Sequence, residues 1–240
     1  MNVVAPRAGD APLRVAVMQP YFFPYAGYFR LFVAADVFLI FDCVQFIRRG
    51  RIHRCEVPGP TGRPEHLTLP LAPAPRETTI ERIRLAPDAR ARMDDRLRRL
   101  AWITRSTGPQ ARQVRDWLEA EPLDGRPLVD YLELSLRRTT ALLGLPARIA
   151  RSSALALPAE LRGPARVIAA VRAVGGGQFV NAPGGVGLYD AAEFAAAGLQ
   201  LSFLTPYEGR FQHMLPALLE RPAQEIADDV RDTTRVVLAA

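Results

Sequence analysis

Apolar residues near the start of this chain form short runs and periodic segments that predict alternating strands and helices. Residues 13–19 and 37–42 are runs rich in Val, Leu, Ile and Phe, as in buried strands. Between them, apolar side chains over residues 25–35 recur at spacings of three and four, which predicts an amphipathic helix. Pro20 and Pro24 cannot donate backbone hydrogen bonds, so a loop should separate the first strand from the helix. The order predicts a βαβ unit with a right-handed crossover.

After the second predicted strand, the pattern changes to short runs broken by Pro and Gly, over approximately residues 47–90. This predicts a small antiparallel insertion, with a hairpin over residues 54–71 that turns at PGPTG, residues 58–62. Helical periodicity then occupies approximately residues 88–143. The helices that we expect there cover residues 88–104, 108–119 and 127–143.

Alternating units return towards the C-terminus. Residues 147–155 predict a strand that ends in a polar Arg-Ser-Ser turn, and residues 161–204 predict helix, strand, glycine loop, helix and strand in order. Such units at both ends predict an α/β fold, with a mostly parallel sheet flanked by helices. We expect residues 1–12 to form a flexible tail and residues 13–240 to form one α/β domain that contains the antiparallel insertion.

Composition narrows the class of protein. The chain has 240 residues, of which 49% are apolar, enough to bury a sizeable core. No apolar run approaches the roughly 18 residues of a membrane helix, and residues 1–14 do not read as a secretory signal. We therefore expect a cytoplasmic protein without a membrane partner. Cys43 and Cys55 are expected to be reduced, and their spacing does not suggest a metal site.

The basic residues exclude several kinds of chemistry. The formal charge is +6, and all 31 basic residues are arginine. Without lysine, the chain cannot form a Schiff base, anchor pyridoxal phosphate or build a GxxxxGK[ST] phosphate loop. The positive charge keeps RNA binding open as an alternative function.

The segment between the first strand and the helix is unusually aromatic. In a parallel α/β sheet, ligands collect outside the carboxyl ends of the strands, where this loop should lie. Tyrosines with flat apolar bodies and hydroxyl tips suit a nucleotide or sugar pocket, and Gly27 would permit close approach. The candidate binding residues here are Gln19, Tyr21, Tyr25 and Tyr28. The alternative interpretation is a buried aromatic cluster that only supports the sheet.

Polar and basic residues follow the second strand. Asp42 is expected to act as a base or as an orienting carboxylate, and His53 is the second catalytic candidate. Arginines nearby suit a bidentate grip on a phosphate or carboxylate. The binding candidates here are Gln45, Arg48, Arg49 and Arg54. The alternative is a solvated basic turn.

The sequence NAPGGVGLYD follows a later predicted strand and precedes a helix. Glycine-rich turns in this position can present backbone amides to an anion, although this spacing is not GxGxxG. The candidates are Asn181, Gly184, Gly185 and Tyr189. Because parallel strands deliver their following loops to one edge of the sheet, we expect one cleft bordered by the opening loop, Asp42, Gln45 and this glycine loop.

The two cysteines should differ in reactivity. Cys43 directly follows Asp42, whose charge should disfavour the thiolate, whereas Cys55 is close in sequence to Arg51, Arg54 and His53, which should favour it. We therefore expect Cys55 to be the more nucleophilic of the two. The alternative is that each acts as a small apolar residue.

The sequences MQPYFFPYAGYF, DVFLIFDCVQF and FVNAPGGVGLYD resemble segments of the WbqC-like family, and the resemblance covers roughly residues 13–205. The chain departs from the family pattern at Cys43, where a second Asp is usual. Arg51, His53 and Cys55 stand where the family has Trp, Asn and Asn. The segment FQHMLPALLERPAQEI also departs from the usual ending, whereas Asp42 and Arg54 match the family pattern. These departures imply a changed substrate or a partly degraded site.

The resemblance implies a role in bacterial surface-glycan or natural-product biosynthesis. The function that we expect is acyl, aminoacyl or related group transfer onto a small intermediate with an anionic group, with aminoacyl-tRNA as one candidate donor; the cofactor is left open. The alternatives are a non-catalytic RNA- or partner-binding protein and a divergent nucleotidyltransferase-like enzyme. The opening strand, loop and YAGY segment are similar to the entry of nucleotidyltransferase/HUP-like folds, but they lack the H-x-G-H histidines, and a KMSKS-type loop needs lysine.

Overall fold

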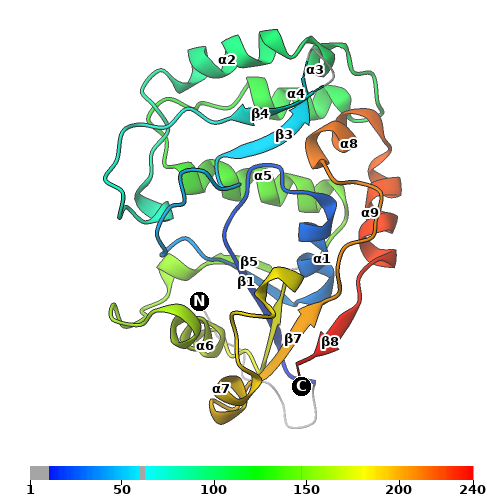
Figure 1. Cartoon of the computed structure of the whole chain (residues 1–240). Coiled ribbons are helices and arrows are strands. Elements are labelled where there is room, and N and C mark those ends of the chain that lie inside the picture. The colour runs from blue at the N-terminus through cyan, green and yellow to red at the C-terminus, as the bar shows by residue number, and fades with distance from the viewer. Residues whose placement is uncertain (1–10, 60–62, 147, 240) are drawn as a thin grey trace.

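The protein is an α/β structure built on a mostly parallel six-stranded sheet of order β5-β2-β1-β6-β7-β8 (Figure 1). The structure is a computed structural model that describes residues 11–59, 63–146 and 148–239. The strands of the sheet are β1 (Arg14–Met18), β2 (Val37–Ile40), β5 (Arg148–Arg151), β6 (Gln178–Asn181), β7 (Gln200–Leu204) and β8 (Val236–Leu238). Neighbouring strands are parallel except β7 and β8. The predicted fold class is therefore confirmed; residues 1–10 of the predicted tail and 60–62 of the predicted turn lie outside the described residues.

Alternation along β1 gives the sheet an apolar core on each face. Val15 and Val17 belong to one core with residues of α6 (Gly163–Ala173) and α7 (Ala191–Ala196). Ala16 belongs to the other core, with residues of α1 (Ala26–Ala34). Successive side chains on a strand point to opposite faces, so a continuous apolar run is what a sheet covered on both faces requires.

The predicted helix is present as α1, but it is buried on nearly every side. The prediction that it is amphipathic is therefore wrong. Arg30 is fully buried, and its guanidinium donates to the backbone oxygens of Thr233 (2.8 Å) and Thr205 (2.7 Å). It also lies 5.3 Å from the ring centroid of Tyr207. The C-terminal part of the chain covers the face of α1 that carries Arg30, and its carbonyl oxygens replace water around the charge.

The insertion consists of a hairpin and a set of helices. Strands β3 (Arg54–Pro58) and β4 (Pro64–Thr68) pair antiparallel, as predicted. The helices are α2 (Ala89–Arg99), α3 (Ala101–Arg105), α4 (Ala111–Glu119) and α5 (Leu128–Leu142). The helix predicted over residues 88–104 is thus two helices. Leu100 leaves the helical conformation (φ −96°, ψ 58°) and is buried at the bend between them.

The C-terminal segment adds three elements that the sequence pattern did not predict. They are α8 (Met214–Glu220), α9 (Ala223–Asp232) and β8. Helix α9 packs against α1, and α8 packs against β3 of the insertion. In Figure 1, this orange-to-red segment runs along one side of the molecule from the sheet to the insertion. The insertion and the chain end therefore meet above the carboxyl end of the sheet.

Candidate ligand-binding cleft

The sheet grows in opposite directions from β1 and from β6, although these two strands are parallel neighbours. From β1 the chain proceeds to β2 and β5 on one side, and it returns to β6 and β7 on the other. The loops after β1 and β6 therefore diverge at this point and leave a crevice at the carboxyl edge, which is where open α/β sheets bind ligands. The geometry predicted for the opening loop and the glycine loop is present, because both loops line one cleft.

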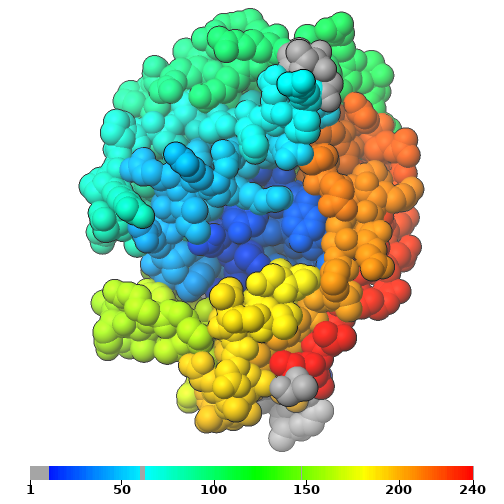
Figure 2. All heavy atoms as spheres, viewed as in Figure 1, coloured from blue at the N-terminus to red at the C-terminus, as the bar shows by residue number. Residues whose placement is uncertain are grey.

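The cleft has a volume of about 1150 Å³. Figure 2 shows it as a hollow with N-terminal residues at its floor and with the insertion, the glycine loop and the C-terminal segment around it. Of the candidates from the sequence, those that line it are Gln19, Tyr21, Tyr25, Tyr28, Arg49, Arg54, Asn181, Gly184, Gly185 and Tyr189. Asp42, Gln45, Arg48 and His53 are not among its lining residues.

The opening loop is held in a tight conformation at the floor of the cleft. Phe23 has φ 41°, in the left-handed region that a residue with a side chain rarely adopts. It is buried and packs edge-on against Phe22 at 5.0 Å between ring centroids. The Tyr28 hydroxyl donates to the backbone oxygen of Gln19 (2.8 Å), and burial raises the Tyr28 pKa well above its usual value. Tyr28 thus fixes the loop, whereas Tyr21 keeps more of its ring exposed.

Gly27 permits close packing of two tyrosines rather than close approach of a ligand. A Cβ atom at Gly27 would lie 2.2 Å from Cε2 of Tyr25 and 2.7 Å from Cγ of Tyr207. The two tyrosine rings lie 5.6 Å apart in an edge-to-face arrangement. The expected close approach at Gly27 is therefore made by two side chains rather than by a ligand or another backbone, and the residue lets Tyr25 and Tyr207 form one wall of the cleft.

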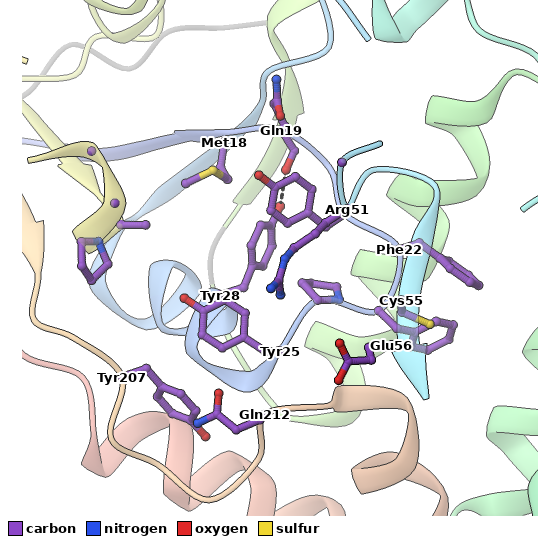
Figure 3. A pocket seen from close by; sticks show the side chains of 18 of the residues that line it. Met18, Gln19, Phe22, Tyr25, Tyr28, Arg51, Cys55, Glu56, Tyr207 and Gln212 are labelled. Atoms are coloured by element: carbon purple, nitrogen blue, oxygen red, sulfur yellow. Dashed lines mark hydrogen bonds between the residues drawn. The ribbon is translucent and has the colours of Figure 1, made fainter. Parts of the chain in front are cut away.

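Three arginines border the cleft, from the segment before β3 and from the first residue of β3. Arg54 donates from Nε to the backbone oxygen of Gly50 (3.1 Å) and from its guanidinium to that of Arg49. Arg51 extends into the space above the tyrosines in Figure 3. Burial raises the pKa of Tyr21, and the nearby positive charge of Arg51 offsets part of the effect. Among the described residues, no carboxylate pairs with Arg51, which leaves its charge available to a ligand.

A carboxylate and an imidazole face each other at the cleft. Glu56 Oε1 lies 3.4 Å from Nε2 of His213, and both residues line the cleft. His66 lies directly across the hairpin from Glu56. The sequence interpretation missed Arg51 and Glu56 as site residues. It also missed His213, Tyr207 and Gln212. A signal for them was present, since they follow β7, another parallel strand whose carboxyl end lies at the same edge.

The glycine loop contributes side chains more than backbone amides. The amide hydrogens of Gly185, Val186 and Leu188 bond within the loop, and Asp190 caps α7 by accepting from Ala192. The amides of Gly184 and Gly187 form no such bond among the described residues, so an amide cradle for an anion stays a prediction. The loop also presents the side chain of Asn181, whose Oδ1 accepts from the Ala182 amide at 2.8 Å.

Close packing places Asn181 and Tyr189 at the cleft. A Cβ atom at Gly185 would lie 2.1 Å from Nδ2 of Asn181, so glycine leaves the space that the amide fills. The Tyr189 ring packs edge-on against Phe179, at 5.3 Å between centroids. No atom lies within 4 Å of the corresponding point at Gly184, which makes that position open.

Asp42 lies outside the cleft, although we expected it to border the ligand site. It is fully buried, and its carboxylate accepts hydrogen bonds from Ser152 Oγ (2.9 Å), from Ser153 N (2.9 Å) and from Ser153 Oγ (2.6 Å). These serines follow β5, which is the neighbour of β2. The carboxyl edge of the sheet was predicted correctly for Asp42, but its side chain fastens two strand ends together instead of facing the cleft.

The other residues expected at the site lie around the insertion. Gln45 donates from Nε2 to the backbone oxygen of Arg76 (2.9 Å), and its backbone forms a bridge with Thr79. Arg48 and His53 line a smaller cavity that has no lining residue in common with the cleft. The single site expected for all these residues is therefore divided between two places.

The prediction that Cys55 is the more nucleophilic of the two cysteines is also wrong. Cys55 is buried, and burial raises the pKa of its thiol well above the usual value. In β3, Arg54 and Glu56 lie on the face opposite Cys55 and Val57, as the alternating burial of this strand shows. Cys43 is half-buried; its sulfur accepts a hydrogen bond from Arg166 Nε at 3.1 Å and lies 3.1 Å from Ser152 Oγ.

Within residues 11–59, 63–146 and 148–239, no three His, Cys, Asp or Glu side chains lie close enough together to hold a metal ion. The helices in the same residues are all too short or too polar to cross a bilayer.

The fold and the cleft define an open α/β protein with a ligand site at the reversal of strand order. The chain belongs to the WbqC-like protein family, whose family model matches residues 19–215. The match spans the opening loop, the hairpin, the glycine loop and His213. Searches of curated proteins and of solved structures found no match. The similarity to nucleotidyltransferase/HUP-like folds therefore stays a prediction.

Proposed function

We propose that this protein is a group-transfer enzyme that moves an acyl, aminoacyl or related group onto a small, anionic biosynthetic intermediate. The observation that carries the proposal is that an arginine without a carboxylate partner, Arg51, shares one cleft with the Glu56–His213 pair. The first can hold an anion, and the second can move a proton. Surface-glycan or natural-product biosynthesis is the setting that the family resemblance suggests.

The arginines support an anionic substrate. Arg51 is an exposed cation at the cleft, with Arg49 and Arg54 beside it in the same segment. Guanidinium groups bind carboxylates and phosphates through paired, charge-assisted hydrogen bonds. Arg51 has no carboxylate partner within the described residues, so its N–H donors are available to a ligand. The substrate class that we propose is therefore a small molecule with a phosphate or carboxylate group.

The size and walls of the cleft support two bound reactants. Sites for one drug-sized ligand measure about 300–1,000 Å³, and this cleft of about 1150 Å³ exceeds that range. Tyr21, Tyr25 and Tyr207 present aromatic surface along it. Flat aromatic walls with polar tips bind sugars and bases, so a donor and an acceptor can lie side by side.

The Glu56–His213 pair supports the proton transfer that such a reaction needs. Glu56 Oε1 lies 3.4 Å from Nε2 of His213, and in the proposed reaction Nε2 carries a proton towards Glu56 while Nδ1 acts as the acceptor. In transfer, a bond forms from the acceptor's oxygen or nitrogen to the donor's acyl carbon, and the bond to the leaving group breaks. The acceptor's proton passes to Nδ1 and then to the leaving group. Glu56 orients the ring and stabilises its charged form.

The first test is a thermal-shift screen with adenosine nucleotides, uridine diphosphate sugars and amino acids. Stabilisation by a true ligand grows with the logarithm of its concentration. We expect one class to stabilise the wild type and to lose its effect in Arg51→Gln, but not in Arg99→Gln, which removes a charge from α2 away from the cleft. No stabilisation by any class, or equal stabilisation of both variants, would contradict the proposal.

An aminoacyl-tRNA donor is the one macromolecular partner that the proposal includes. The charge of +6 supports contact with an RNA backbone, and phosphate-driven binding weakens steeply with salt. A gel-shift titration with bulk tRNA should show retention at about 50 mM salt and loss near 200 mM. Absence of retention at the lower salt concentration would remove tRNA from the proposal, and would leave a small-molecule donor.

A further inference from the structure

A second cavity lies between the insertion hairpin and helix α2, apart from the cleft. Its volume is about 270 Å³, and none of its lining residues lines the cleft. The polar residues that line it come from three segments: Arg48 and His53 before β3, Thr68 at the end of β4, and Arg92 and Arg96 on α2. Two separate segments thus direct basic groups towards one small space, and a third adds a hydroxyl group.

The charge of this cavity is unbalanced. Arg48, Arg92 and Arg96 line it, whereas no Asp or Glu does among the described residues that form its wall. Burial lowers the pKa of Arg96, and the charges of Arg92 and Arg99 lower it further. The contribution of Arg92 and Arg99 means that the positive charges around Arg96 repel one another. An anion in the cavity would therefore reduce the free energy of the folded state.

Backbone contacts hold two of these arginines in place. Arg96 Nη1 donates to the backbone oxygen of Thr68 at 2.5 Å, and Arg48 donates to that of Ala74. Neither forms an ion pair with a described residue. Arg92 approaches only Asp88, at 3.6 Å, and both side chains are largely exposed, which makes that pair weak. Each guanidinium therefore keeps N–H groups for another partner.

His53 provides an independent sign of an unfilled site. Its side chain is about nine-tenths buried, it lines the cavity, and its Nδ1 has no hydrogen-bond partner among the described residues. The ring packs against Phe46, with 5.2 Å between centroids. Burial, and then the charges of Arg54 and Arg96, lower the His53 pKa to about 4. The ring is therefore neutral near pH 7, and it retains one N–H that a ligand oxygen can accept.

We propose that this cavity binds a compact oxyanion, the phosphate or carboxylate group of a small metabolite, through Arg48, Arg92, Arg96 and His53. The volume lies just under the roughly 300 Å³ of the smallest usual ligand sites, which favours a compact group over a nucleotide. Arginine supplies the paired donors that both kinds of oxyanion accept. The site is separate from the cleft, so the proposal does not depend on the transfer function.

The test titrates the intact protein with inorganic phosphate and, separately, with malonate, at constant ionic strength. Isothermal titration calorimetry is compared for the wild type, Arg48→Gln, Arg92→Gln and the matched controls Arg172→Gln, on α6 away from both cavities, and Arg51→Gln. We expect at least one anion to bind, with about tenfold weaker affinity in the Arg48 and Arg92 variants, as for the loss of one charge-assisted bond. Unchanged affinity in the controls would locate the anion in this cavity rather than in the cleft.

Histidine side-chain ¹⁵N NMR gives a second readout that does not depend on stability. The saturating anion should shift the His53 signals, assigned through His53→Gln, and leave those of His66 and His213 in place. A response to phosphate alone or to malonate alone distinguishes the two sources of oxyanion. The proposal is overturned if neither anion binds, if Arg48→Gln and Arg92→Gln bind as tightly as Arg172→Gln, or if His53 does not respond.

Discussion

His213 Nε2 lies 3.4 Å from Oε1 of Glu56, and this contact joins the segment before α8 to β3 of the insertion. Neither residue belongs to the parallel sheet. The sheet provides the floor of the cleft through the loops after β1 and β6, whereas the insertion and the C-terminal segment provide the groups that can move a proton. In the proposed function, the pair that moves a proton therefore comes from outside the parallel sheet.

Substitutions in this pair should affect turnover more than binding. With the ligand that the screen identifies and its co-reactant, His213→Gln should lower kcat by about 10² to 10⁴, the usual contribution of general acid–base catalysis. Glu56→Gln should lower it less, because Glu56 acts through the ring. The double variant should be little worse than His213→Gln, since the two residues act as a unit. A double variant whose losses simply multiply would contradict the pairing.

The glycine loop offers a matched pair of substitutions. Gly185→Ala should displace Asn181 from the cleft, because the added Cβ would lie 2.1 Å from its Nδ2. Gly184→Ala meets no atom within 4 Å and should leave the loop unchanged. We expect affinity for the cleft ligand to fall by about tenfold in the first variant, as for the loss of one hydrogen bond, and to stay constant in the second. Equal affinities would show that Asn181 does not contact the ligand.

His53 should make stability depend on pH in a defined window. The folded protein protonates it only near pH 4, whereas its ordinary pKa is 6.5. Between these values the unfolded chain binds the extra proton, so the free energy of unfolding should fall as the pH drops from 6.5 to 4 and should be constant in this term above 6.5.

Urea unfolding in piperazine buffer, without phosphate or carboxylate, measures this effect. Other groups also titrate in the window, so the quantity of interest is the difference in slope between the wild type and His53→Gln. We expect the wild type to lose about 2 kcal/mol more than the variant across the window, from roughly 1.4 kcal/mol per unit of pKa shift with allowance for solvent near the ring. Parallel curves would contradict the burial of a neutral ring.

The cysteines should react in the order Cys43 before Cys55. Cys43 is half-buried and its sulfur contacts the Arg166 guanidinium, whereas Cys55 is buried with a raised thiol pKa. Alkylation by iodoacetamide follows exposure and thiolate content. Timed alkylation with peptide mass mapping should label Cys43 first in the native protein and both residues in urea. Native labelling of Cys55 before Cys43 would contradict the structure.

Local patterns predicted the parts of the fold that depend on local sequence. The order of β1, α1 and β2, the hairpin and the loops on both sides of the strand reversal all followed from periodicity and from Pro and Gly. Helices α8 and α9 were missed because α8 has Pro216 within it and because their stability depends on contacts with β3 and α1, distant in the chain. Burial of Arg30 depends on the same long-range contacts.

The site residues show the limit of the rule that loops after parallel strands lie at one edge of the sheet. The rule gives the edge of the sheet at which a residue lies, but not the direction of its side chain. Asp42 reached the expected edge, and the serines after β5 then took up its carboxylate. For Cys55, the period-two alternation of β3 predicted the buried face better than the charges of its sequence neighbours did.

The anion grip of Arg51 is the central claim, and one titration tests it most directly. Isothermal titration calorimetry of the ligand from the thermal-shift screen is compared between the wild type, Arg51→Gln and Arg99→Gln. The account predicts that Arg51→Gln weakens binding by about tenfold or more, since a charge-assisted bond contributes roughly 1.5–3 kcal/mol, and that Arg99→Gln binds as the wild type does. Equal affinity in Arg51→Gln and Arg99→Gln would contradict it.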